Sequence, residues 1–196
     1  MMALVLVTPP ASEPVTLAEA KAHLRVETAA DDALIAILIT TARQSAEQWL
    51  NRALLAQTWR AQWDGAPEGD VLELPKAPLQ SVVHVKTYDD ADAATVFAAS
   101  NYFVDTARQP GRVVLRLSAA WPVTSRTAGG FEVQFVAGYG ALASDVPAAI
   151  RQGILVHVAS LYTMRGDFVS AEGTLQPADL PASAHALYAP WRLLRL

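Results

Sequence analysis

The 196-residue chain contains no cysteine. This absence excludes disulfide frameworks, thiolate zinc sites, iron–sulfur clusters and cysteine nucleophiles. Charged residues make up only 17% of the chain, and 19 acidic side chains against 15 basic ones give a formal net charge of −4. Because tight nucleic-acid binders present a basic face to the phosphates, this balance argues against a free-standing nucleic-acid-binding protein.

Long apolar runs are also missing. The two longest, Met1–Val7 and Ala33–Ile39, are far shorter than the ~18–20 residues that cross a bilayer. No basic residue precedes the first run, so it lacks the charged start of a secretory signal. We therefore expect a soluble protein with no membrane partner, whose first residues form an extended strand or an arm at an interface. Hydrophobic residues make up 52% of the chain, enough for a real core.

Helical signals occupy both ends of the chain. Thr16 and Glu19 have the spacing of a capping box, which predicts a helix to about Arg25. Asp31-Asp32 offers an N-cap for a second helix, roughly Asp32 to Asn51, whose apolar residues recur every three to four positions. Pro147 is placed to open a third helix near 147–165. Residues 166–180 read as a loop, and 181–188 as a short helix.

The middle of the chain has the period-two alternation of strands. Strand candidates are Gln57–Trp63, Val71–Leu74, Ser81–Tyr88, Tyr102–Val104, Val113–Leu117 and Phe131–Val136. No connection between them is long enough for the helical crossover that parallel strands require, so the sheet should be antiparallel.

These elements predict a mainly helical α+β fold with an inserted antiparallel β module. Residues 1–53 would form an N-terminal arm and helices, 54–140 the β module, and 141–196 the C-terminal helices and tail. The first and last of these segments should together form one helical core.

No catalytic constellation stands out. Gly138–Ala143 matches G-x-G-x-x-A, but the helix signal begins only near Val146-Pro147, whereas a dinucleotide site needs the glycine turn itself to open the helix. The four histidines lack metal-ligand spacing, and we expect no metal, no cofactor and no enzymatic activity. A small-ligand or nucleotide site at Gly138–Gly140 remains the alternative.

Interaction surface is the more informative signal. Ile35, Ile37 and Ile39 widen the apolar surface of the second helix beyond one stripe, which suggests contacts on two sides. We expect these isoleucines, with Trp49 and His157, to form subunit contacts. From residue 64 to 105, eight acidic residues accompany only two lysines. Asp89, Asp90 and Asp92 lie within this stretch as a predicted acidic hairpin tip that could line a channel.

The sequence also resembles a known family, the head–tail connector (adaptor, or head-completion) proteins of long-tailed phages and of related gene transfer agents. The matching segments are Val15–Lys21, Asp31–Ile35, Arg52–Trp59, Leu74–Val82, Pro110–Arg112, Trp121-Pro122, Phe135–Gly140, Val146–Ile150 and Ala189–Arg192. Their order and spacing match over nearly the whole chain. Each is a structural signature rather than a reactive site.

The resemblance implies a ring of about twelve copies under the portal of a DNA-filled head. Such a ring extends the DNA channel, lets double-stranded DNA pass without sequence-specific binding, and carries a stopper, neck or tail-terminator protein. It would lie in the neck of the particle after assembly in the bacterial cytoplasm. The C-terminal segment of the family reaches the portal, which gives a portal-binding role to Trp191, Arg192, Leu193, Leu194, Arg195 and Leu196. Another kind of phage or bacterial assembly protein is the remaining possibility.

Overall fold

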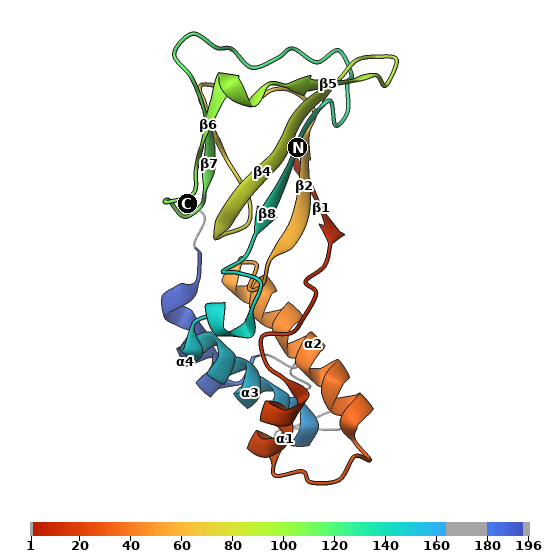
Figure 1. The fold of residues 1–196 in the computed structure, drawn as a ribbon, viewed down its shortest axis with the longest axis vertical. Coiled ribbons are helices and arrows are strands. Elements are labelled where there is room, and N and C mark those ends of the chain that lie inside the picture. The colour runs from red at the N-terminus through yellow and green to blue at the C-terminus, as the bar shows by residue number, and fades with distance from the viewer. Residues whose placement is uncertain (1, 164–179, 194–196) are drawn as a thin grey trace, which may run out of the picture. The chain divides into compact units, whose positions relative to one another are not determined.

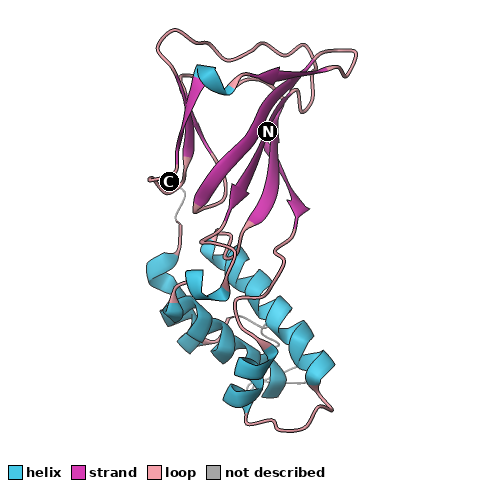
Figure 2. Ribbon diagram, in the orientation of Figure 1, coloured by secondary structure: helices cyan, strands magenta, loops and turns pink. Residues whose placement is uncertain are grey.

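The computed structural model describes residues 2–163 and 180–193. Its chain divides into two compact units. We call residues 1–11 with 55–141 the sheet unit, and residues 12–54 with 142–196 the helical unit. Figure 2 shows how helices and strands are divided between them.

The expectation of a mainly helical protein is wrong. The chain is 34% helix and 28% strand, with two antiparallel sheets, so the fold is α+β without a helical majority. Two strands account for much of the difference. Residues 2–8 form a strand of the larger sheet, and residues 94–97 form a strand that the sequence patterns did not indicate.

Within the residues that the structure describes, the helical unit contains four α-helices. They are α1 (Leu17–Leu24), α2 (Asp32–Leu50), α3 (Ala148–Thr163) and α4 (Ala182–Tyr188), with short 3₁₀ turns at Ala143–Asp145 and Ala189–Trp191. The capping box of α1 is confirmed: the Glu19 amide donates to the Thr16 hydroxyl over 3.2 Å, and the Thr16 amide donates to the Glu19 carboxylate over 2.8 Å. Asp31 does not cap α2 with its side chain; its carboxylate instead accepts from the Tyr162 hydroxyl.

The core of this unit lies where α2, α3 and α4 meet. Buried apolar side chains from these helices fill it: Ile35, Ile39, Ala42, Ala46, Leu50, Ile150, Ile154, Val158, Ala184 and Tyr188. Gly153 permits the close approach of α3 and α4, since a Cβ there would lie 2.3 Å from the Tyr188 ring. The helices therefore pack through a position where only glycine fits.

The sheet unit contains a five-stranded and a three-stranded antiparallel sheet (Figure 1). The larger sheet has the order β1 (Met2–Thr8), β2 (Gln57–Trp63), β8 (Phe131–Ala137), β4 (Leu79–Tyr88) and β5 (Ala94–Phe97). The smaller sheet has the order β3 (Val71–Glu73), β7 (Arg112–Leu115) and β6 (Tyr102–Asp105), and a 3₁₀ turn at Ala99–Asn101 precedes β6. The sequence correctly predicted β2, and it placed the other predicted strands to within a few residues.

The two faces of the larger sheet differ in chemistry. On one face, Ala61, Val85, Val133 and Phe135 are fully buried and form the core of the unit. On the opposite face, the strand register places one residue from each strand in a row: Ala3, Gln62, Glu132, Lys86 and Val96. We call this opposite side the polar face.

Candidate assembly surfaces

The described part of the C-terminal tail is anchored to the end of α2. The Leu193 amide donates to the Leu50 carbonyl over 3.0 Å, and Arg52 Nε donates to the Trp191 carbonyl. The Arg192 guanidinium lies 4.7 Å from the centre of the Trp49 ring, a cation–π contact. The first three residues of the predicted portal-binding segment are thus fixed on their own subunit, and Leu194, Arg195 and Leu196 lie outside the described residues.

Trp49 is the centre of this anchor. Its ring also meets the His185 ring edge-on, with the ring centroids 4.5 Å apart, and lies 6.3 Å from the Tyr188 ring. The half-buried Trp49 ring is therefore contacted by Arg192, His185 and Tyr188 of its own chain. Its predicted contact with a neighbouring subunit would have to share this surface.

The residues predicted as subunit contacts on α2 and α3 fall into two groups, buried and exposed. Ile35 and Ile39 are 0% and 3% exposed, and His157 is 5% exposed, so all three contribute to the core of their own subunit. Ile37, by contrast, is 64% exposed. Of these four residues, Ile37 is the one whose side chain is exposed, and its role as a subunit contact stays a prediction. The spacing in the sequence did not distinguish the two sides of the helix.

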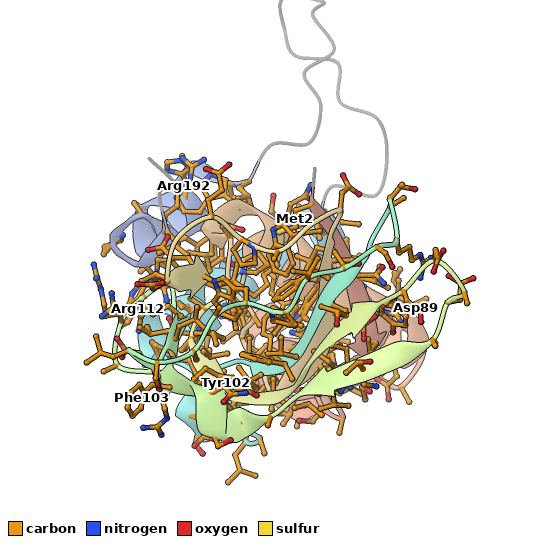
Figure 3. All side chains as sticks on the ribbon, turned by 90° about the horizontal axis from the view of Figure 1, so that it is seen from above. Met2, Asp89, Tyr102, Phe103, Arg112 and Arg192 are labelled. Carbon is orange, nitrogen blue, oxygen red and sulfur yellow. The ribbon has the colours of Figure 1, made fainter. Side chains whose placement is uncertain are left out.

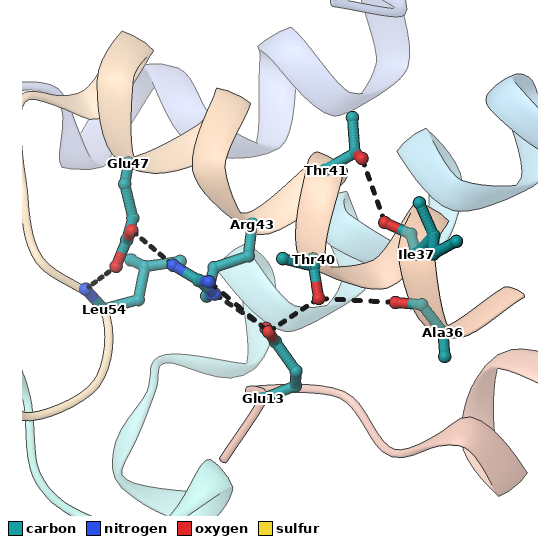
Figure 4. A network of polar contacts seen from close by, with 8 residues as sticks. All are labelled: Glu13, Ala36, Ile37, Thr40, Thr41, Arg43, Glu47 and Leu54. Atoms are coloured by element: carbon teal, nitrogen blue, oxygen red, sulfur yellow. Dashed lines mark hydrogen bonds and ion pairs between the residues drawn. The ribbon is translucent and has the colours of Figure 1, made fainter. Parts of the chain in front are cut away.

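A buried ionic network joins three segments of the helical unit (Figure 4). Arg43, 6% exposed, donates to Glu13 over 2.7 Å and to Glu47 over 2.8 Å. The other oxygen of Glu47 accepts from the Leu54 amide over 2.8 Å, and Thr40 donates to Glu13 over 2.9 Å. The network therefore fixes the chain at residue 13, shortly before α1, and at residue 54, the last residue of this segment of the helical unit.

The electrostatics of Arg43 follow from this arrangement. Burial by itself would lower the pKa of the guanidinium, but the hydrogen bonds and negative charges of Glu13 and Glu47 more than offset burial and raise that pKa. The attraction between a buried cation and its carboxylates repays their desolvation only where the geometry is good and further hydrogen bonds are made, as they are here. The cluster is a structural clamp, because the carboxylate oxygens of Glu13 and Glu47 already accept hydrogen bonds from the chain itself.

The acidic hairpin tip lies between β4 and β5, and Figure 3 labels Asp89 at its outer end. Asp89, Asp90 and Asp92 are all exposed. The Asp89 carboxylate accepts from the amides of Ala91 and Ala93, and Asp92 pairs with Arg126 over 3.4 Å. The Asp89 carboxylate thus stabilises the turn itself, whereas Asp92 connects the turn to the loop that carries Arg126. Among the residues that the structure describes, no three His, Asp or Glu side chains are grouped to hold a metal ion.

The glycine turn after β8 has a structural explanation. Gly138 has φ +138°, and a Cβ there would lie 2.3 Å from the Leu55 carbonyl oxygen. Its amide donates to the Pro78 carbonyl, and its carbonyl accepts from the Gln80 side chain, both over 2.9 Å. The Gly138 amide, which a bound phosphate would need, is thus used within the chain, and the next α-helix begins only at Ala148. The geometry therefore gives no support to the nucleotide-site alternative.

Sequence reasoning missed a buried carboxylate on the polar face. Glu132 is 3% exposed and accepts from Gln62, His84 and Tyr88 over 3.0–3.1 Å. Burial and the negative charge of Glu132 together raise the pKa of the Tyr88 hydroxyl. Glu132 alternates with Phe131 and Val133 along β8 and so lies on the opposite face from them. The side chains that cover Glu132 come from β2 and β4, which are far away in the sequence.

The sequence was compared with models of known protein families and with curated proteins. Residues 14–94 match the family model of the phage gp6-like head-tail connector protein. No curated protein matches the sequence significantly. No helix in residues 2–163 or 180–193 has the length and apolar character of a membrane span.

The similar solved structures come from gene transfer agent (GTA) particles. A chain from the neck of an empty GTA particle, reconstructed with C6 symmetry, is 27% identical with a TM-score of 0.81, covering 99% of this chain and 97% of that one. A chain from the virion of a native GTA particle is 26% identical with a TM-score of 0.80, covering 98% and 96%. A third, from the native GTA neck with C12 symmetry, is 26% identical with a TM-score of 0.76, covering 100% and 97%. The family model therefore identifies residues 14–94 as phage gp6-like head-tail connector sequence, and the similarity to chains of GTA particles extends over nearly the whole chain.

Proposed function

We propose that about twelve copies of the protein form a ring that binds the portal, extends the DNA channel and carries the next neck or tail protein. The observation that carries this proposal is the similarity over the whole chain to a protein of a C12-symmetric neck. The C6 symmetry of a second similar neck is compatible with it, because a ring of twelve also has sixfold symmetry. The protein would act through its shape, without catalysis, in the particle neck after assembly in the cytoplasm.

The charge of the protein supports a passage for DNA. Double-stranded DNA must slide through the ring, and a strongly basic lining would retain its phosphates. The exposed Asp89, Asp90 and Asp92 and the net charge of −4 favour a lining that repels them. We therefore retain the acidic hairpin tip as the candidate channel surface.

Two parts of the C-terminal tail have different proposed roles: one anchors the tail to its own subunit, and the other contacts the portal. Trp191, Arg192 and Leu193 anchor the tail to α2. We propose that Leu194, Arg195 and Leu196 then contact the portal, with Arg192 as the exposed residue beside them. Ile37, exposed on α2, is the proposed apolar contact with a neighbouring subunit.

The test is attachment to purified portal-bearing heads that lack this protein. Electron microscopy of heads mixed with the protein should show a ring of about twelve copies on the portal. A chain shortened to end at Leu193 should keep its thermal melting temperature, because the anchor stays complete, and should no longer co-sediment with the heads. Ile37→Asp should block ring formation without loss of helicity, and exposed Leu142→Asp is its matched control. Absence of any ring with the unchanged protein would refute the proposal.

A further inference from the structure

The five-stranded sheet ends in two unprotected edges, β1 and β5 (Figure 1). Neither strand contains a charged residue, proline or glycine. Val5, Leu6 and Val7 of β1 are 41–43% exposed, and Val96 of β5 is 60% exposed. Soluble proteins usually block such edges with lysine, proline or a covering segment, because unpaired backbone groups there recruit another strand. Among the described residues, no further strand pairs with either edge.

The backbone directions identify the free groups of β5. The Tyr88 amide donates to the Gly130 carbonyl over 2.9 Å, on the β8 side of β4. Since backbone groups alternate sides along a strand, Thr87 directs its own groups toward β5, where it is paired with Thr95. Ala94 and Val96 therefore direct their N–H and C=O groups away from the sheet.

The same alternation identifies the free groups of β1. The Gly138 amide bonds to the Pro78 carbonyl at the opposite end of the β8–β4 pair, so the even-numbered residues of β8 face β4 and the odd-numbered ones face β2. Through the register, the odd-numbered residues of β2 face β8, and its even-numbered residues face β1. Their partners on β1 are Ala3 and Val5, which leaves Leu4 and Leu6 with backbone groups directed outward.

We propose that the β1 edge of one copy pairs with the β5 edge of the next, so that the sheets join from subunit to subunit around the ring. The proposal rests on the ring proposed above. A ring requires two different surfaces that fit each other, and one sheet presenting two different open edges meets that requirement. Both edges are uncharged, so neither repels the other electrostatically.

The direction of the pairing follows from the topology. Each neighbouring pair in the sheet is antiparallel, so β1, β8 and β5 run the same way. Adjacent copies in a twelvefold ring differ by a rotation of about 30°, which preserves that sense. The new pair is therefore parallel, with the polar face continuous across the joint and Val96 near Ala3 or Val5.

The area buried by the β1–β5 pairing determines whether free copies associate in solution. A ladder limited by the four residues of β5 buries far less than the ~1,200 Å² that a stable pair of proteins needs. Pairing should consequently occur when copies are collected on the portal and the ring closes. We expect the dilute free protein to remain monomeric.

The first experiment uses disulfide trapping, which is clean because the chain has no cysteine of its own. The double variants Ala3→Cys/Val96→Cys and Val5→Cys/Val96→Cys are mixed with portal-bearing heads and oxidised. At least one should give a ladder of covalent multimers on non-reducing gels. The matched control is Val5→Cys/Val83→Cys, since Val83 is 53% exposed but lies on the interior strand β4; it should give none.

The second experiment removes one free N–H. Val96→Pro deletes the outward amide of β5 without deleting a donor of the β4–β5 ladder, and Val96→Ala keeps that amide. We expect Val96→Pro to lower the number of copies bound per head at least tenfold relative to Val96→Ala, with equal melting temperatures for the free proteins.

The outcomes separate the two proposals. If the unchanged protein forms rings on heads, but neither double variant cross-links and Val96→Pro attaches as Val96→Ala does, the edge pairing is refuted and the ring stands. A cross-link of β1 or β5 to the portal or to another neck protein would likewise overturn pairing between copies. If the unchanged protein forms no ring, both proposals fail.

Discussion

The helical unit and the sheet unit use their buried polar groups differently. In the helical unit, Arg43 connects Glu13 to Glu47 and, through Glu47, to the Leu54 amide, so its buried charges tie together its own distant segments. In the sheet unit, Glu132 collects side chains from neighbouring strands, while β1 and β5 remain unpaired on their outer sides. The buried charges of the helical unit therefore connect its own distant segments, whereas the sheet unit leaves the outer backbone groups of two edge strands unpaired within the described residues.

The largest loss of stability is expected from a substitution that breaks the ionic network of the helical unit. Arg43→Met leaves two carboxylates without their buried counter-charge and should lower the free energy of unfolding by about 3–5 kcal/mol. Urea unfolding followed by circular dichroism measures it. Arg108→Met, at an exposed position, should change the stability by less than about 0.5 kcal/mol. Equal effects of both substitutions would mean that the network contributes nothing specific.

A smaller loss is expected at the polar cluster of the sheet unit. Glu132→Ala removes the acceptor of Gln62, His84 and Tyr88 and should cost about 1–3 kcal/mol. Gln134→Ala, two residues along the same strand on the same face, is the control and should cost less. Chemical denaturation of the two variants gives the comparison. If they are equally stable, the cluster is not a stabilising centre of the sheet.

The contact between α3 and α4 offers a sharper test of packing. Helix propensity alone predicts that Gly153→Ala is stabilising by about 1 kcal/mol. The new methyl group would meet the Tyr188 ring at 2.3 Å, so we expect a net loss of about 1–2 kcal/mol instead. Thermal melting decides the sign. In a Tyr188→Leu background the penalty should disappear, because the ring that blocks the methyl group is gone.

The smallest effect concerns His157 and the pH dependence of the helical unit. Burial lowers the pKa of His157, whose Nδ1 has no hydrogen-bond partner in the described structure. The unfolded chain therefore takes up a proton near pH 6.5 that the folded protein resists, so stability is full above this pH and falls as the pH drops below it. His157→Leu should flatten the unfolding free energy between pH 7 and about pH 5. Replacement of the exposed His23 by leucine should leave the slope unchanged.

Local signals in the sequence predicted the local structure well. Thr16 and Glu19 form the expected capping box because all of its atoms lie within one turn. The alternation over residues 57–63 predicted β2 with its correct bounds, with Ala61 fully buried. The resemblance to head–tail connectors was also confirmed, since it depends on the order of many short segments.

Features that depend on distant partners could not be predicted in this way. β1 pairs with a strand more than 50 residues later, and β5 has only four residues, too few for a clear period. Ile35, Ile37 and Ile39 are equally apolar, and only the positions of the other helices decide that Ile37 alone is exposed. The proposed assembly sites are of the same kind, because backbone groups at a sheet edge leave no mark in the sequence except the absence of charge.

The bond from the Leu193 amide to the Leu50 carbonyl fixes the point at which the chain leaves the helical unit. While that bond holds, the residues after Leu193 start from a position set by the C-terminal end of α2. A partner bound through those residues would therefore be coupled mechanically to α2 of this subunit.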